Sequence, residues 1–128
     1  MKEHTLEWIE KAEEDFRVAE WIIKAPAASP AATAFHCQQC IEKWMKAILV
    51  EKEREVPKTH DLILLANLLT PVVSFGESTR EILRTMTMYA VEHRYPGLMA
   101  SPEDAAEAME SCRELRRRLR TILGLAEA

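Results

Sequence analysis

One long apolar segment, residues 30–54, constrains the fold of this chain more than any other feature. Apolar residues recur on more than one side of the helix that it predicts, which is typical of a helix surrounded by other helices. Polar residues also recur along it at steps of three or four. Polar groups inside a bundle are costly unless paired, so this helix must hold an internal polar network or present a site. The polar stripe consists of His36, Gln39, Lys43 and Lys46.

Four further helices are predicted around this central one, and no segment shows the alternating pattern of a strand. Each has apolar residues at helical spacing, which make one buried face. Four long helices with short connections predict an all-α, up-and-down antiparallel four-helix bundle with an additional short helix, as a single domain over residues 1–128. The helices outside the central one are predicted over about residues 6–24, 60–69, 79–94 and 102–123.

Capping residues indicate where these helices begin. Ser29 precedes a proline, which is a typical N-cap and first-turn pair for the central helix. Thr59 is expected to cap the short helix, with Asp61 as a first-turn acid, and Ser78 opens a capping-box pattern for the next one. Ser101 precedes a second proline and two acids, which suit the start of the last helix.

The composition limits the classes of protein that fit. A net charge of −4 provides no global basic field for coating nucleic acid or a membrane surface. The longest uncharged run, residues 62–76, is short and interrupted by Asn, Pro, Ser and Gly, so no membrane span is expected. The N-terminus lacks the apolar core of a secretory signal, and three cysteines fit a reducing compartment. We therefore predict a cytoplasmic protein.

The cysteines and histidines do not form a metal or redox motif. Cys37 and Cys40 make a single C-x-x-C pair inside the central helix, whereas a structural zinc site usually needs four ligands. A redox pair needs its first cysteine at a helix N-terminus. We interpret both as buried free thiols and expect neither a metal nor a cofactor.

A basic cluster lies near the C-terminus. The favoured interpretation is a solvated helix face, stabilised by the helix dipole and by Glu110 and Glu114. The alternative is a contact with phosphate or RNA. The four arginines that share one face are Arg113, Arg116, Arg117 and Arg120.

Several short segments in the first four helices combine aromatic and polar residues in a distinctive order. They are Trp8, Ala12-x-x-Asp15-Phe16, Phe35-His36-x-Gln38-Gln39-x-x-Glu42-Lys43-x-x-Lys46-Ala47, Thr59-His60-Asp61-Leu62 and Arg94-Tyr95-Pro96-Gly97. In this order they resemble the HEPN domain family (higher eukaryote and prokaryote nucleotide-binding domain). The resemblance covers nearly the whole chain.

The resemblance implies a helical bundle that is usually a homodimer. Many small members are encoded beside a minimal nucleotidyltransferase and form with it a two-component module that behaves as a toxin–antitoxin system. Toxic members are metal-independent RNases. Their motif is an Arg, a polar residue and then a His, with four to six residues between Arg and His, and two copies meet at the dimer interface.

This sequence departs from the nuclease motif. No histidine occurs in the six residues after Arg94, and His93 precedes it. The one match in spacing, Arg54 to His60, crosses Pro57 and has Glu55 at the polar position, so we interpret it as a coincidence. Our first hypothesis is therefore a nucleotide-binding helical component of a HEPN/nucleotidyltransferase module, rather than an enzyme on its own.

The candidate nucleotide-binding residues divide by chemistry. The cations would contact phosphate, Tyr95 or His36 would contact a base or ribose, and Asp15 would orient a cation. The first alternative is a metal-independent RNase that acts on RNA, with His60 as general acid or base and Arg54 or Arg94 stabilising the transition state. The second is a purely structural α-helical dimer whose polar stripe fixes helix register. The candidate set is Asp15, His36, Gln39, Lys43, Lys46, Arg94 and Tyr95.

Overall fold

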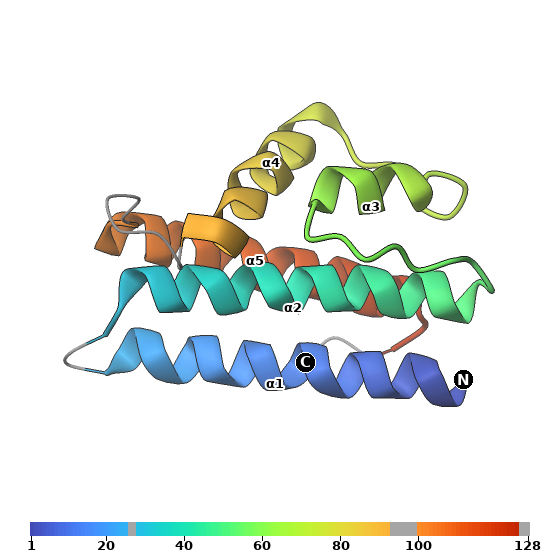
Figure 1. Cartoon of the computed structure of the whole chain (residues 1–128), viewed down its shortest axis with the longest axis horizontal. Coiled ribbons are helices and arrows are strands. Elements are labelled where there is room, and N and C mark those ends of the chain that lie inside the picture. Colours follow the sequence, from blue (N-terminus) through green and yellow to red (C-terminus); the bar gives the residue numbers. More distant parts are fainter. Residues whose placement is uncertain (26–27, 93–99, 126–128) are drawn as a thin grey trace.

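A computed structural model describes residues 1–25, 28–92 and 100–125, and its regular secondary structure within these ranges is entirely helical (Figure 1). This confirms the all-α prediction. Because Arg94 and Tyr95 lie outside the described residues, the part they play in the site stays a prediction from sequence. The helices are α1 (Glu3–Lys24), α2 (Pro30–Glu51), α3 (Leu62–Leu68), α4 (Glu77–Glu92) and α5 (Pro102–Ile122).

The long helices form the predicted up-and-down bundle. In Figure 1, α1, α2 and α5 lie lengthwise beside one another, and α1 runs opposite to α2 and α5. Helix α4 crosses the bundle at an incline, and the short α3 lies over the C-terminal half of α2. Helix α2 contacts all four other helices, which confirms it as the central element.

The core forms around the apolar residues of α2. Trp44 and Ile48 are fully buried, and so are two small residues of the neighbouring α1, Ala12 and Ala19. Small side chains allow two helix axes to approach closely. Polar residues carried on the same helix are therefore drawn into or against the core.

Two helices begin at the predicted caps. The Ser29 hydroxyl oxygen accepts a hydrogen bond from the Ala32 amide at 3.1 Å. At the start of α5, Ser101 and Asp104 form a reciprocal capping box with distances of 3.0 and 2.9 Å. These interactions satisfy amides that have no partner within the helix.

Two predicted caps are wrong. Asp61, not Thr59, caps α3, because its carboxylate accepts from the Ile63 and Leu64 amides at 2.9 and 3.4 Å. Thr59 instead accepts from the Asp61 amide and so orients the cap. Helix α4 begins at Glu77, directly after a glycine, so Ser78 is already helical and the predicted capping box does not form.

The central helix ends at Glu51, three residues before the predicted end near residue 54. The chain reverses at Glu53, whose φ is +58°. The Glu53 amide donates to the Val50 carbonyl at 3.0 Å, and the Arg54 amide donates to the Leu49 carbonyl at 2.8 Å. This pair is a Schellman closure, which satisfies the last carbonyls of the helix and sends the chain back toward α3.

None of the helices in the described ranges combines the length and the apolar character needed to cross a bilayer.

Candidate functional site

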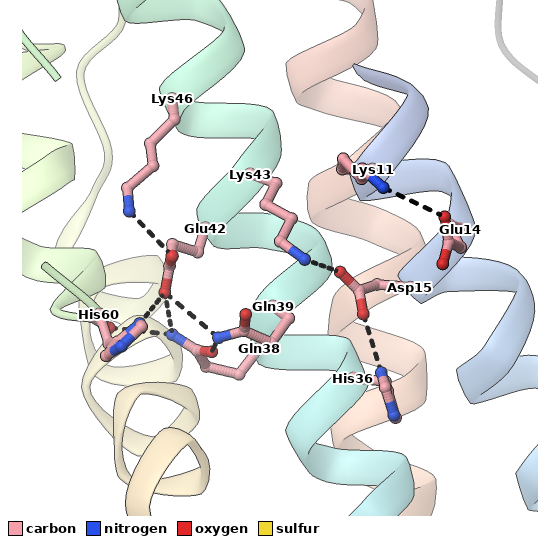
Figure 2. A network of polar contacts seen from close by, with 10 residues as sticks. All are labelled: Lys11, Glu14, Asp15, His36, Gln38, Gln39, Glu42, Lys43, Lys46 and His60. Atoms are coloured by element: carbon pink, nitrogen blue, oxygen red, sulfur yellow. Dashed lines mark hydrogen bonds and ion pairs between the residues drawn. The ribbon is translucent and has the colours of Figure 1, made fainter. Parts of the chain in front are cut away.

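The polar residues of α2 sort into two clusters, each organised by one carboxylate (Figure 2). The Asp15 cluster consists of Asp15 from α1 with His36 and Lys43 from α2. The Glu42 cluster consists of Gln38, Gln39, Glu42 and Lys46 from α2 with His60 from the segment before α3. The predicted single stripe is thus divided between two carboxylates.

In the Asp15 cluster, one carboxylate holds two basic side chains. Asp15 Oδ2 lies 2.6 Å from Lys43 Nζ, and Asp15 Oδ1 lies 2.8 Å from His36 Nδ1. Lys43 is one of the cations that Asp15 is predicted to orient. Asp15 itself is buried, whereas the side chains of Lys43 and His36 are 23% and 27% exposed. The cluster therefore presents a fixed basic pair at the surface.

The ring of His36 has a second neighbour. Phe35 packs edge-on against it, with ring centroids 5.2 Å apart and an interplanar angle of 80°. Edge-to-face geometry is a favoured arrangement of aromatic rings. The Asp15 carboxylate and Phe35 together define the orientation of the His36 imidazole.

In the Glu42 cluster, one buried carboxylate meets four side chains. Lys46 Nζ lies 2.9 Å from Oε2, and His60 Nδ1 lies 2.8 Å from Oε1. Gln38 and Gln39 donate to Oε1 at 3.2 and 3.4 Å. The side chains of Glu42 and Lys46 are only 4% and 7% exposed. A buried carboxylate needs this number of partners, because an unpaired one would carry a large desolvation penalty.

Further contacts tie the Glu42 cluster to its surroundings. Gln38 Nε2 also donates to the His60 carbonyl at 2.9 Å, and Gln39 Nε2 donates to Gln38 Oε1 at 2.7 Å. Lys46 Nζ lies 5.5 Å from the centroid of the Trp8 ring, which is a cation–π distance. Lys46, a predicted phosphate contact, therefore has its ammonium group enclosed between Glu42 and an aromatic ring.

His60 is the exposed member of the Glu42 cluster. Its side chain is 57% exposed while Nδ1 is held by Glu42. A hydrogen bond from Nδ1 to a carboxylate sets the tautomer and leaves Nε2 as the acceptor. The structure therefore gives this histidine the carboxylate-oriented geometry that acid–base chemistry uses.

Arg54 is not brought to His60. Its Nη1 donates to the Leu68 carbonyl at 3.3 Å, at the C-terminal end of α3, whereas His60 precedes the N-terminal end. A helix of this length separates its ends by about 10 Å at 1.5 Å per residue. Arg54 and His60 therefore match the motif in sequence spacing, but their side chains do not lie together in the fold.

The interpretation of the C-terminal arginines as a solvated face is wrong for Arg116. It is buried and forms a bidentate ion pair across to Glu13 on α1, with an Nε–Oε2 distance of 2.7 Å. Arg120 reaches the same carboxylate at 3.2 Å, and Phe16 lies 4.2 Å from the Arg116 guanidinium. Sequence reasoning missed Glu13, because 103 residues separate it from Arg116.

The pKa values of Glu13 and Arg116 reflect the contacts between them. Burial by itself raises the pKa of Glu13, but the hydrogen bond and charge of Arg116, together with the charge of Arg120, hold it below its usual value. The pKa of Arg116 is correspondingly raised, first by its hydrogen bond to Glu13. The seam between α1 and α5 is thus an ionic contact at neutral pH.

The cysteines are buried free thiols, as predicted. A hydrogen bond with Cys112 and burial raise the pKa of Cys37 far above its usual range, and the pKa of Cys112 is raised as well. Cys37 Sγ also lies 3.8 Å from Met109 Sδ, between α2 and α5. Protonated thiols in this setting pack as small apolar groups. Within the residues that the structure describes, no group of three or more His, Cys, Asp or Glu side chains is arranged to hold a metal ion.

These features define a class of all-α bundle proteins built around one central helix with ion-paired polar side chains. The sequence matches the profile of the HEPN domain over residues 5–122, nearly its whole length, and the chain therefore belongs to the HEPN domain family. This confirms the resemblance seen in the sequence.

The crystal structure of TT1696 from Thermus thermophilus has a similar fold, with a TM-score of 0.82 and 19% sequence identity. The match covers 94% of this chain and 99% of that protein. At this identity the likeness concerns the fold alone. No curated protein matches the chain.

Proposed function

We propose that this HEPN-domain protein is the helical, nucleotide-binding component of a two-component module with a nucleotidyltransferase, and that it acts as a homodimer without catalysis of its own. The Asp15 cluster carries the proposal. A buried carboxylate fixes a lysine and a histidine at the surface, where both keep part of their side chains open to solvent. Preorganised donors of this kind bind an anionic ligand with little loss of side-chain entropy.

Each member of the cluster has a distinct proposed role. Lys43 uses one of its three ammonium donors on Asp15, so the others are available to a phosphate. The His36 ring would contact the base or ribose, and Arg94 and Tyr95 would extend the site. Gln39 and the enclosed Lys46 are held by Glu42 instead and do not contact the Asp15 carboxylate.

Calorimetric titration of ATP tests this proposal. Lys43→Ala and Arg94→Ala should each weaken binding at least tenfold. Lys11→Ala is the matched control, because it removes an exposed lysine from the neighbouring helix, where Lys11 Nζ lies 4.0 Å from Glu14. Unchanged ATP binding in both variants, with a lower Tm, would show that the stripe only stabilises a structural dimer.

The partnerships need separate measurements. Met88 and Val91, which are exposed and three residues apart on α4, support a protein interface. Light scattering should give twice the chain mass of 14.7 kDa. Co-purification with a minimal nucleotidyltransferase from the same genome tests the second partnership, and a monomer that captures no such enzyme would refute both.

A second candidate function, metal-independent RNA cleavage, is favoured by the pairing of His60 with Glu42. A buried carboxylate orients this imidazole, and the side chain is exposed enough to meet a substrate. The test is cleavage of RNA in EDTA by the wild type, His60→Ala and Arg94→Ala. Full cleavage by His60→Ala would exclude this mechanism.

A further inference from the structure

A small basic groove lies between α1 and α5, away from both polar clusters of α2. Its volume is about 280 Å³, and Phe16, Glu20, Arg113, Arg116 and Arg117 line it. Pockets for whole small molecules usually measure about 300–1,000 Å³. This groove therefore has room for one charged group, with the rest of a ligand outside.

The groove carries more positive than negative charge. Four arginines meet there, since Arg120 adjoins the three that line it, and the only carboxylates paired with them are Glu13 and Glu20 among the described residues. Glu13 is already shared by Arg116 and Arg120. The lining itself, with three arginines and one glutamate, is predominantly basic.

The two outer arginines are the ones left available. Arg113 lies 3.7 Å from Glu20, beyond hydrogen-bond distance, and its side chain is 44% exposed. Arg117 is exposed and has no carboxylate at ion-pair distance in the part of the chain that the structure describes. These residues are four apart on one helix, where like charges repel and destabilise the helix.

We propose that Arg113 and Arg117 form a binding site for a phosphate group, with the fixed Arg116–Phe16 pair as its floor. A guanidinium presents a planar fork of donors that matches phosphate oxygens. Binding of a phosphate dianion also relieves the repulsion between the two arginines. Glu20 competes with the ligand for Arg113.

Titration of inorganic pyrophosphate into the full chain, at constant ionic strength set with chloride, tests the site. Arg113→Gln/Arg117→Gln should weaken binding at least tenfold. Arg84→Gln is the matched control, because Arg84 is an exposed arginine on α4 that pairs with Glu77 at 3.0 Å. Equal binding by the double variant and the wild type would overturn the proposal, as would wild-type protein that binds no pyrophosphate.

The Glu20→Gln variant distinguishes a ligand site from a purely structural ion pair between Arg113 and Glu20. If Glu20 competes with phosphate, this variant should bind pyrophosphate several-fold more tightly. A lower Tm with no gain in affinity would instead assign Arg113 and Glu20 to helix packing and refute the site.

Two further experiments identify the source of the phosphate and test whether this site is independent of the proposed nucleotide site on α2. A 5′-phosphorylated single-stranded RNA that displaces pyrophosphate would indicate a polynucleotide, whereas pyrophosphate binding that the RNA does not compete with would indicate a small phosphate ester. The titrations are repeated in the Lys43→Ala background, which removes the proposed phosphate contact on α2, and the loss of affinity in Arg113→Gln/Arg117→Gln should persist there. Pyrophosphate bound on α2 is then not mistaken for pyrophosphate bound between α1 and α5.

Discussion

The Asp15 and Glu42 clusters each join a carboxylate to a lysine and a histidine, yet their lysines differ in burial. Glu42 lies beneath the segment that carries His60 and is surrounded by four side chains. Asp15 comes from the neighbouring helix and holds two side chains that stay partly open. The comparison teaches that the same kind of lysine–carboxylate pair can be enclosed in one place and stay partly open to solvent in another, depending on what covers it.

The largest expected effect comes from Glu42→Ala. Removal of this carboxylate leaves the buried Lys46 unpaired, and breaking a buried pair in this way destabilises by about 3–5 kcal/mol. Urea unfolding followed by circular dichroism measures the change. A loss below about 1 kcal/mol, the usual worth of exposed pairs, would remove the distinction between the clusters.

A double variant keeps this test interpretable if Glu42→Ala does not fold. Replacing both charges in Glu42→Leu/Lys46→Met removes the unpaired ammonium, and well-packed apolar replacements of buried pairs are often close to neutral. The double variant should therefore be more stable than Glu42→Ala. Lower stability would show that the glutamine and His60 contacts, rather than the ion pair, hold this region.

The fold followed from the sequence because local signals agreed with one another. Apolar spacing in each helix, the caps at Ser29 and Ser101, and the multi-sided apolar character of α2 all predicted the observed bundle. The errors lie at helix ends, where neighbouring residues compete. Thr59 and Asp61 can both cap a helix, and only the packed position of α3 decides between them.

Glu13 is a third carboxylate, which is more exposed than Glu42 and Asp15 but is shared by two arginines. Glu13→Gln should lower the free energy of unfolding at pH 7 by about 2–3 kcal/mol, somewhat less than for a fully buried pair, because Arg116 and Arg120 lose their shared partner. Thermal unfolding of both proteins across pH measures this. An effect larger than that of Glu42→Ala would contradict the ranking by burial.

The pH dependence of this variant has a defined sign. Because the folded state lowers the pKa of Glu13 below its ordinary value of 4.5, its stabilising contribution is complete above that value. It is lost as pH falls through the lower folded pKa. The stability difference between the wild type and Glu13→Gln should therefore be constant near neutrality and shrink in acid, and a difference that persists unchanged in acid would exclude this electrostatic origin.

The candidate site was harder to predict than the fold, because its contacts join distant segments. Asp15 and Lys43 were both predicted, and the structure pairs them. The central role of Glu42 was not recognised, although Gln38, Glu42 and Lys46 lie four residues apart on one helix face. Its link to His60 depends on how the segment before α3 folds back, which no local pattern encodes.

Asp15→Asn should have a smaller effect on stability than either glutamate variant. The amide keeps an acceptor for one neighbour but loses the charge that favours Lys43, a change of about 1–2 kcal/mol. Chemical unfolding gives the stability, and ATP titration shows whether orientation of the basic pair matters for binding. Affinity that is unaffected would separate Asp15 from the proposed nucleotide site.

The smallest change in stability is expected for Lys43→Met, and it completes the comparison with Lys46→Met. Lys43 is partly exposed, and solvent screens its ion pair, so its loss should change the free energy of unfolding by less than about 1 kcal/mol. Lys46→Met leaves Glu42 buried with fewer donors and should destabilise the protein more.

Nucleotide affinity should change in the opposite order, because the ammonium of Lys43 is accessible and that of Lys46 is enclosed. Parallel urea unfolding and ATP titration of the two variants measure both orders. If Lys46→Met lost affinity while Lys43→Met kept it, the nucleotide would be assigned to the Glu42 cluster and the Asp15 cluster to stability.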